Sequence, residues 1–420
     1  MRKLMTTVCI MVIATGMIFA GGTGESKSST TETVTLRWLM QVASAEEARQ
    51  WRELAAGVTE RYPDILVELS TTDWNGYWTK LPSELAGGNP PDILYMQSMR
   101  AKDYLEAGFL PLSQYVADDP DINIADFYSG ILEGLSIGEE LYCLPYDFGP
   151  YVMFYNQDLF DLYGLPYPDT IETAEDFEEL CSQFAGHDTY GTVVPTVMDK
   201  LYTYFLGSGA SLFAADGTVK VNDSRIIETI EYLQGLIDQG YAPRISDTGN
   251  NNWDREQFYA GNVATYLDGP WNLTNIKEKS SFAVGVTMVP PGNLYRRSQV
   301  AGSGFGISKD TDYPGEAYLA IKELTSKNSL SKLAGWGRAL PARSSVRDVY
   351  YELHADVNGL HDAVEKSITT DIGVPFITPM KWQQVTNTIS QNLEAIFIGN
   401  VSARKGLDNA QEIIDGILGQ

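Results

Sequence analysis

The sequence predicts an α/β protein with two lobes, each a sheet flanked by helices, on the basis of three observations. The chain has 420 residues, more than one hydrophobic core usually supports. Segments with the two-residue period of strands alternate with segments that have the period of helices. Between Glu140 and Pro168, a cluster of prolines and glycine precedes an apolar strand, which suggests a crossing from one lobe to the other.

The first elements form a strand–helix–strand unit. Residues 33–40 alternate between apolar and polar side chains, as a strand does. Ser44 and Glu47 have the spacing of a capping box, and the apolar helical stripe that follows ends before Pro63. Residues 65–69 alternate again, so this part predicts a parallel sheet covered by a helix.

A second unit of the same kind follows. It comprises a helix at 81–86, a turn at 87–91 and a short buried strand at 92–96. Ligands in open α/β sheets bind beyond the carboxyl ends of the strands. This rule makes Gln97 and Ser98 candidate site residues, together with Trp38 near the end of the first strand. Trp74, which opens the unit, is either a site residue or a core residue.

The proposed crossing begins with a turn at 144–150, which two prolines and a glycine interrupt. A strand at 151–155 is aromatic or β-branched at most positions and is expected to be buried on both faces, and a short helix ending at Gly164 follows it. Between two lobes, Asp147 and Tyr151 would face a cleft. The alternative is an ordinary turn before a core strand.

Later segments add helices and one unusual turn. Asp223 caps an amphipathic helix that ends at Gly240, and further apolar stripes follow Pro314 and begin at Trp382. In residues 268–271 (DGPW), glycine permits an unusual backbone and proline suits the start of a helix, so Trp271 is presented at a helix start.

Composition and charge limit the partners. The formal net charge of −25 argues against binding nucleic acid or an anionic membrane surface. A neutral ligand fits best. His187, His354 and His361 share no ligand spacing with a cysteine, so we expect no metal and no cofactor, and we expect surface or packing roles for these histidines.

Residues 1–22 have the pattern of a secretory signal, with two basic residues, an apolar run and small residues at the expected cleavage point. Residues 23–32, rich in Gly, Ser and Thr, are expected to form a flexible leader. Cys9 lies within the apolar run rather than at the cleavage point, so we expect a soluble periplasmic protein without a lipid anchor. Cys143 and Cys181 could form a disulfide in that compartment, but two buried thiols are favoured.

Several short motifs resemble those of a known family. They are Arg61-Tyr62-Pro63, the LAGGNPPDI run at 85–93, the AGFLPL run at 107–112, LPY through YN at 144–156, FYAGNVA through DGPW at 258–271, VAGSGFGI at 300–307 and LPAR at 340–343. In this order they resemble the extracellular solute-binding proteins of ABC importers, in the sugar-binding family that includes the maltodextrin-binding protein.

The resemblance implies a periplasmic-binding-protein fold of type II-like organisation, in a monomer that passes its ligand to the permease subunits of an ABC transporter. It implies a first lobe of residues 33–146 with 303–372, a second lobe of residues 147–302 with 373–420, and a hinge of three crossings. It places Ser303 on the return crossing and implies an aromatic contact to sugar at Trp382, for which core packing is the alternative.

The residue types suit a carbohydrate. A sugar offers apolar C–H faces to flat aromatic rings and a rim of hydroxyl groups to polar side chains. The chain has eight Trp and 24 Tyr, and the candidates for ring contact include Trp271, Trp382 and Trp336. The candidates for polar contact are Asp147, Asp268, Gln97 and Arg338.

Two other classes of function stay open from the sequence. A secreted glycoside hydrolase would also carry aromatic residues and carboxylates, although the chain contains no nucleophile elbow, metal motif or phosphate loop. A binding protein for a polyamine, a peptide or a sugar phosphate is the other alternative. The strand end at 95–98 lacks the acidic residue of the maltodextrin-binding pattern, so maltose itself is not expected.

Overall fold

The computed structural model describes residues 33–214, 217–246, 249–250, 252–369, 371–375, 378 and 381–419. The predicted signal and leader lie outside this range. The strands are β1 (Val34–Gln41), β2 (Ile65–Thr72), β3 (Ile93–Gln97), β4 (Ser136–Ile137), β5 (Glu140–Leu141), β6 (Cys143–Pro150), β7 (Val152–Asn156), β8 (Thr265–Asp268), β9 (Val284–Met288), β10 (Ser298–Ile307) and β11 (Gly373–Pro375).

The α-helices of the described residues are interspersed among these strands, as the sequence predicts. They are α1 (Ala45–Arg61), α2 (Trp74–Ala86), α3 (Ala101–Gly108), α4 (Ser113–Asp118), α5 (Ser129–Gly134), α6 (Gln157–Tyr163), α7 (Ala174–Ser182), α8 (Met198–Ser208), α9 (Ser224–Asp238), α10 (Trp253–Tyr259), α11 (Leu273–Lys279), α12 (Pro314–Leu324), α13 (Lys327–Gly335), α14 (Arg347–Leu353), α15 (Leu360–Ser367), α16 (Trp382–Phe397) and α17 (Ala403–Leu418). Short 3-10 turns include η1 (Ser98–Arg100) and η4 (Pro270–Asn272).

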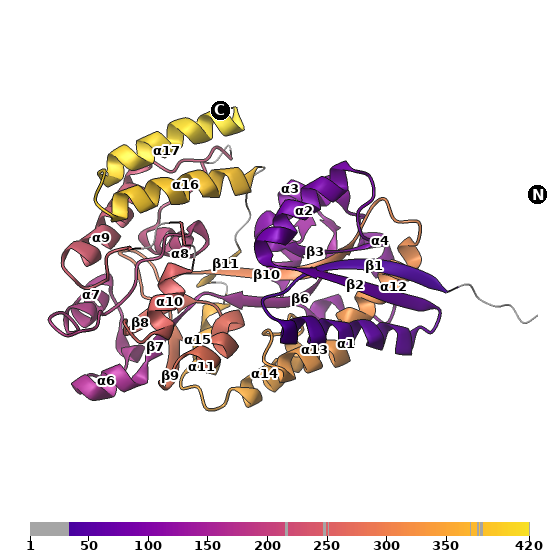
Figure 1. Cartoon of the computed structure of the whole chain (residues 1–420), viewed down its shortest axis with the longest axis horizontal. Helices are drawn as coiled ribbons and strands as arrows, with labels where there is room; N and C mark the ends of the chain where they lie inside the picture. Colours follow the sequence, from indigo (N-terminus) through magenta and orange to yellow (C-terminus); the bar gives the residue numbers. More distant parts are fainter. Residues whose placement is uncertain are drawn as a thin grey trace, which may run out of the picture. The chain divides into compact units, whose positions relative to one another are not determined.

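Two main sheets organise the described residues. The larger has the order β11-β10-β3-β1-β2, with β6 paired to β10, and the smaller has the order β8-β7-β9. The pairs β1–β2 and β1–β3 are parallel, whereas β10 runs antiparallel to β3 and β6. Figure 1 shows α1 and α13 along one side of the β1–β2 region and α2 and α3 along the other, and α12 packs on α1, β1 and β2. The predicted α/β architecture is therefore confirmed.

Local sequence signals explain where the first helices begin. The Ser44 hydroxyl accepts a hydrogen bond from Glu47 N. The Glu47 carboxylate accepts one from Ala43 N, whereas in a standard capping box it would accept from the N–H of Ser44, one residue later. The helix predicted at 81–86 begins earlier, at Trp74, because the Asp73 carboxylate accepts from Gly76 N and caps it.

The segment at 144–150 is a strand, β6, and not the turn that the sequence predicts. Its prolines are tolerated because of where they lie. Pro145 stands where the β6–β10 register shifts, and Pro150 ends the strand. A proline has no N–H to donate, so bulges and strand ends are the places where a sheet accepts it.

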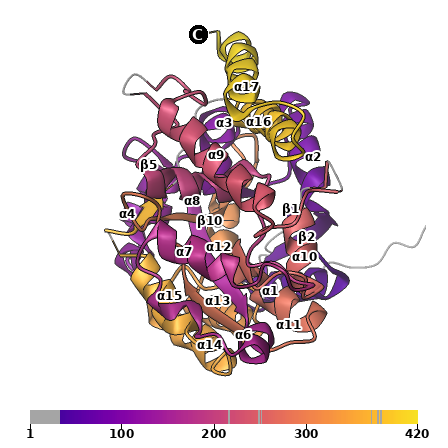
Figure 2. The ribbon, with the colours of Figure 1, turned by 90° about the vertical axis from the view of Figure 1, so that its left-hand side faces the viewer.

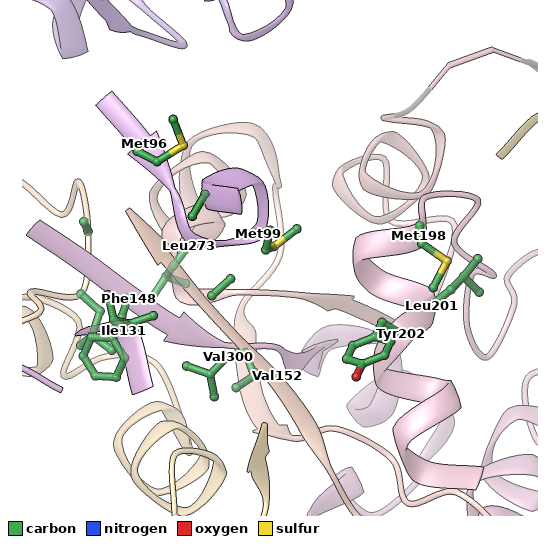
Figure 3. Packing of buried hydrophobic residues seen from close by; sticks show 14 of the residues in the cluster. Met96, Met99, Ile131, Phe148, Val152, Met198, Leu201, Tyr202, Leu273 and Val300 are labelled. Carbon is green, nitrogen blue, oxygen red and sulfur yellow. The ribbon is translucent and has the colours of Figure 1, made fainter. Parts of the chain in front are cut away.

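The strands β6 and β10 continue the core toward the smaller sheet. Every residue of β10 is buried, and the Ser298 hydroxyl donates to Tyr151 O immediately before β7. Figure 3 shows Phe148 of β6, Val152 of β7 and Val300 of β10 in one region, and all three belong to the main buried cluster. The two sheets are thus joined by packed strands rather than by loose linkers.

Two helix contacts bear on the lobes. Figure 2 shows α16 and α17 side by side near the carboxyl end of the chain, and these helices pack on each other and on α9. The helix α15 packs against β9, and Asn358 just before it forms a parallel bridge with Gly285 of that strand. The family resemblance groups residues 303–372 with the first lobe, so this contact is a reason to move α15 to the second. The boundaries remain a prediction.

Cys143 and Cys181 are free and buried, as favoured above. Of the histidines, His354 is buried and His361 is largely exposed.

Candidate functional site

Trp271 and Tyr151 form an aromatic cluster that is separate from the main core. Tyr151, Leu267 and Val289 are buried together, and the half-buried rings of Trp271 and Tyr204 pack against them. The Trp271 and Tyr151 rings meet edge-on, with centroids 5.2 Å apart. Two of the predicted site residues are therefore in contact, and the Trp271 ring retains exposed surface.

Two glycines provide the surface against which the Trp271 ring lies. A Cβ added at Gly269 would lie 2.1 Å from a ring carbon of Trp271, and one added at Gly149 would lie 3.2 Å from another. No side chain fits at Gly269 unless the ring moves. The glycine in the DGPW motif is thus required for the position of the ring as well as for the turn.

A half-buried carboxylate lies near this cluster. Asp199, in the first turn of α8, has no hydrogen bond or ion pair among the described residues, but the charges of Arg100 and Lys200 act on it and oppose the rise in its pKa that burial causes. Burial raises the pKa of Tyr151, and the nearby Asp199 charge raises it further. The sequence analysis missed Asp199, because an acid in the first turn of a helix is usually explained by the helix dipole.

A second group surrounds Arg100 of η1, which the sequence analysis also missed. Its guanidinium lies 5.1 Å from the centroid of the Trp74 ring and 4.8 Å from that of Trp78. It donates to Gln97 Oε1 at 2.5 Å and to Gln383 Oε1 at 3.1 Å. The predicted residues Trp74 and Gln97 are thus brought together by a cation from a neighbouring turn.

A third group lies where β6 meets β10. Asp147 Oδ1 accepts from Ser303 N at 2.7 Å, and the Ser303 hydroxyl lies 3.0 Å from the Tyr95 hydroxyl. Burial raises the pKa of Asp147 to about 6, although the Arg338 charge and the Ser303 hydrogen bond act against the shift. Arg338 itself is held by Glu47, with 2.6 Å between Arg338 Nε and Glu47 Oε1. Asp147, Ser303 and Arg338 therefore share one polar region.

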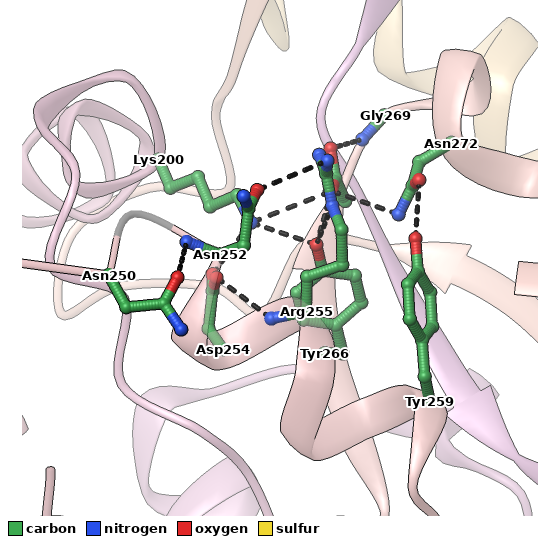
Figure 4. Close-up of polar contacts among 10 residues, drawn as sticks. Lys200, Asn250, Asn252, Asp254, Arg255, Tyr259, Tyr266, Gly269 and Asn272 are labelled. Atoms are coloured by element: carbon green, nitrogen blue, oxygen red, sulfur yellow. Dashed lines mark hydrogen bonds and ion pairs between the residues drawn. The ribbon is translucent and has the colours of Figure 1, made fainter. Parts of the chain in front are cut away.

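A fourth group is centred on Asp268 at the end of β8, and Figure 4 labels its neighbours Lys200, Arg255, Tyr266 and Asn272. Asp268 is 1% exposed, and its carboxylate is surrounded by Arg255, Lys200, Tyr266 and Asn272. The sequence analysis expects Asp268 to contact the ligand. The structure shows it buried, with protein donors at both carboxylate oxygens, which favours a structural role.

Two predicted aromatic site residues are core residues. Trp38 is fully buried, and its ring meets Trp51 and Phe305 edge-on at 5.7 and 5.2 Å. Trp382 is 1% exposed and packs beside Phe213, which agrees with the core alternative for this residue. Strand and helix periodicity identify both as apolar positions, but periodicity alone does not show which tryptophan borders a site.

The remaining predicted residues occupy intermediate positions. Ser98 is buried, and its hydroxyl accepts from Gly302 N at 3.3 Å, so it supports the β10 backbone. Trp336 is half-buried at the end of α13 and packs on the main core. Two surface hollows of about 430 Å³ lie elsewhere, one beside Tyr318 and one beside Arg37, and of the predicted site residues Trp38 alone borders either of them.

These side chains can bind a small polar ligand with apolar faces. They offer half-buried rings, an unpaired carboxylate and amide and guanidinium groups. In the described part of the chain, no group of three or more His, Cys, Asp or Glu residues could hold a metal ion.

Comparison with known proteins defines the class first. The chain is similar to an ABC substrate-binding protein from Listeria monocytogenes in complex with cycloalternan, with a TM-score of 0.83 and 22% identity over 92% of this chain and 100% of that one. The fold is therefore that of the two-lobed binding proteins. The model of the bacterial extracellular solute-binding protein family matches residues 43–329, and the chain belongs to this family.

Relatives in sequence agree with this family. A putative binding protein of Brucella abortus (strain 2308) is 23% identical over 394 residues, covering 89% of this chain and 91% of the relative. A maltooligosaccharide ABC transporter solute-binding lipoprotein of Streptococcus pneumoniae serotype 4 is 26% identical over 309 residues, covering 69% of this chain and 67% of the relative. The resemblance identified in the short motifs is confirmed.

Proposed function

We propose that this solute-binding protein captures a neutral sugar between its two lobes and delivers it to an ABC importer. The observation that carries the proposal is the aromatic cluster of Trp271, Tyr151 and Tyr204, which is separate from the main core and lies beside the unpaired carboxylate of Asp199. A flat ring beside a hydrogen-bond acceptor is what the two surfaces of a pyranose require.

The charges of the site favour a neutral ligand over a polyamine. Although the whole chain is acidic, the Asp268 carboxylate is neutralised by Lys200 and Arg255, and Glu47 is paired with Arg338. Of the acids in the groups above, only Asp147 and Asp199 lack an ion pair among the described residues, and a polyamine would need more free carboxylates than these at its site. A sugar phosphate is also disfavoured, because it would need a free cation at the site. The Arg100 guanidinium already donates to two side-chain amides, and Arg100 is 8% exposed.

The contact residues that we propose are half-buried members of the groups above, together with the buried Tyr151. Trp271 and Tyr151 would supply the ring contact, with Trp74 and Trp336 as further aromatic surfaces. Hydroxyl groups of the ligand would meet Asp199, Asp147, Gln97 and Arg338. Ser98 and Ser303 would support the strand β10.

Three aspects of the biology belong to the same proposal. Residues 1–22 would direct export to the periplasm, and among the described residues no helix is long and apolar enough to cross a membrane. Delivery would be to the permease subunits of an ABC transporter. The relative from Streptococcus pneumoniae is named as an ABC transporter solute-binding lipoprotein. The protein would bind its ligand without transforming it, since the family is one of solute-binding proteins.

A thermal-shift screen of neutral oligosaccharides, polyamines and short peptides tests the proposal. We expect a rise in melting temperature with at least one oligosaccharide, because a ligand that binds only the folded state stabilises it. Chromatography of the incubated sugar should show it intact. Stabilisation by a polyamine or a peptide alone, or release of a cleavage product, would refute the proposal.

A further inference from the structure

The Asp268 carboxylate is buried and already accepts four hydrogen bonds from the protein. Asp268 Oδ2 receives hydrogen bonds from the Tyr266 hydroxyl, from Arg255 Nη2 at 3.0 Å and from Asn272 Nδ2 at 3.2 Å. Asp268 Oδ1 receives Gly269 N at 2.8 Å. Since the carboxylate is buried and both of its oxygens bind protein donors, its contacts are with its neighbours.

The charges around Asp268 form a balanced cluster, which we call the ion cluster: Lys200, Asp254, Arg255 and Asp268. Lys200 Nζ lies 2.6 Å from Asp254 Oδ2 and 3.5 Å from Asp268 Oδ2. Two cations balance two anions, so this buried group has no net charge to stabilise. Burial acts to raise the pKa of Asp268, but the Lys200 and Arg255 charges outweigh it and hold that pKa at about 2.

The ion cluster holds the turn that carries Trp271 from both sides. Asp268 precedes the tryptophan, and its carboxylate binds the N–H of Gly269, the residue against which the indole lies. Asn272 follows the tryptophan, donates to Asp268 and accepts from the Tyr259 hydroxyl at 2.8 Å. Figure 4 shows these contacts converging on the turn from α10, β8 and η4.

We propose that Asp268 is a positioning residue for Trp271: through Gly269 and Asn272, the ion cluster sets the orientation of the indole that receives the ligand. A ring held in its binding orientation loses little freedom on association, so affinity depends on a carboxylate that never touches the ligand. This inference rests on the proposed function only for the claim that the Trp271 ring contacts a sugar. The orientation of the ring is a property of the free protein.

The first test therefore uses no ligand. Protein labelled with ¹⁵N at its tryptophans should give an indole N–H resonance for each of the eight, and Trp271→Phe identifies the one from Trp271. Asp268→Asn should displace or broaden that resonance more than any other. Asp126→Asn is the matched control, because Asp126 is also buried and paired with an arginine, Arg343 at 3.2 Å, but on the larger-sheet side.

A double-mutant cycle supplies the second readout once the thermal-shift screen has named a sugar. Asp268→Asn should weaken binding about tenfold in the wild-type background, which lies within the range for residues of one network, and should change it little when Trp271→Ala is already present. A merely structural role for Asp268 would lower affinity equally in both backgrounds.

An unmoved Trp271 resonance in Asp268→Asn, or additive losses in the cycle, would overturn the inference. If Asp268→Asn does not fold, Tyr259→Phe takes its place, because it removes only the hydroxyl that binds Asn272. It should move the same resonance by a smaller amount, and no movement would again overturn the inference. If the protein binds no sugar, the proposed function is refuted. The resonance experiment would still decide the inference that Asp268 positions Trp271.

Discussion

The rings of Trp271 and Tyr151 stand at 89° to each other with 5.2 Å between their centroids. This edge-to-face contact joins η4 to the end of the β6–β7 crossing, two segments that are more than 100 positions apart in the chain. The contact is favourable because the positive edge of one ring meets the negative face of the other. It ties the proposed binding surface to the crossing.

Trp271→Ala should weaken sugar binding by about 2 kcal/mol or more, roughly thirtyfold, because an aromatic anchor carries a large share of the binding energy. Calorimetric titration with the sugar from the screen measures this. The melting temperature of the free protein should change little, since the ring is half-buried. Near-normal affinity with a large drop in melting temperature would place Trp271 in the core instead.

Trp38→Ala should do the reverse. Its ring is fully buried against Trp51 and Phe305, so its loss leaves a cavity that costs about 3–5 kcal/mol of stability. Urea denaturation measures the loss. At temperatures where the variant stays folded, sugar affinity should match that of the wild type, and a large loss of affinity would return Trp38 to the site.

Asp147→Asn should change the pH dependence of stability. The pKa of Asp147 is raised by burial from 3.8 to about 6, so the folded state binds a proton that the unfolded state has already released. Stability therefore falls as pH rises from about 4 to 6. The variant removes this loss and should be more stable than the wild type at pH 7, by on the order of 1 kcal/mol, with a smaller difference at pH 4.

Chemical denaturation across this range measures the difference between the two proteins. Parallel curves from pH 4 to 7 would show that Asp147 titrates normally. If Asp147 also accepts a hydroxyl of the ligand, the more stable variant should bind sugar more weakly.

The burial of His354 predicts that the folded protein loses stability in acid. It is buried, neither ring nitrogen has a hydrogen-bond partner in the described part of the chain, and burial with the nearby Lys277 charge lowers its pKa from 6.5 to about 4. The unfolded state therefore takes up a proton first, and stability falls as pH drops from about 6.5 toward 4.

His354→Leu should lose that acid dependence, up to about 3 kcal/mol between pH 7 and pH 4. Thermal melts at several pH values measure it. His361→Leu is the control, since the His361 side chain is largely exposed, and its melting curves should follow the wild type at each pH. Equal acid sensitivity in His354→Leu and the wild type would contradict the assignment.

Much of the fold follows from local patterns in the sequence. Alternation and helical stripes predict β1, α1, β2 and the helix that begins at Trp382, because burial of one face imposes the period. Local patterns predict a turn where the structure has the strand β6. Its prolines are explained only by the pairing with β10, which is set by residues about 150 positions away.

The site was predictable in type but only partly in position. The DGPW turn marks Trp271 by its own chemistry, and the structure joins it to Tyr151. Arg100 and Asp199 carry no local signal, since their importance comes from neighbours on other elements. The burial of Asp268 likewise depends on Lys200 and Arg255, which are distant in the sequence or on another element.

The central claim is that a sugar is captured between two lobes that close on it, and small-angle scattering tests it most directly. A ligand that contacts both lobes stabilises the closed form relative to the open one. The radius of gyration should therefore decrease when a sugar that binds by calorimetry is added to saturation. Tight binding with an unchanged scattering curve would contradict the account.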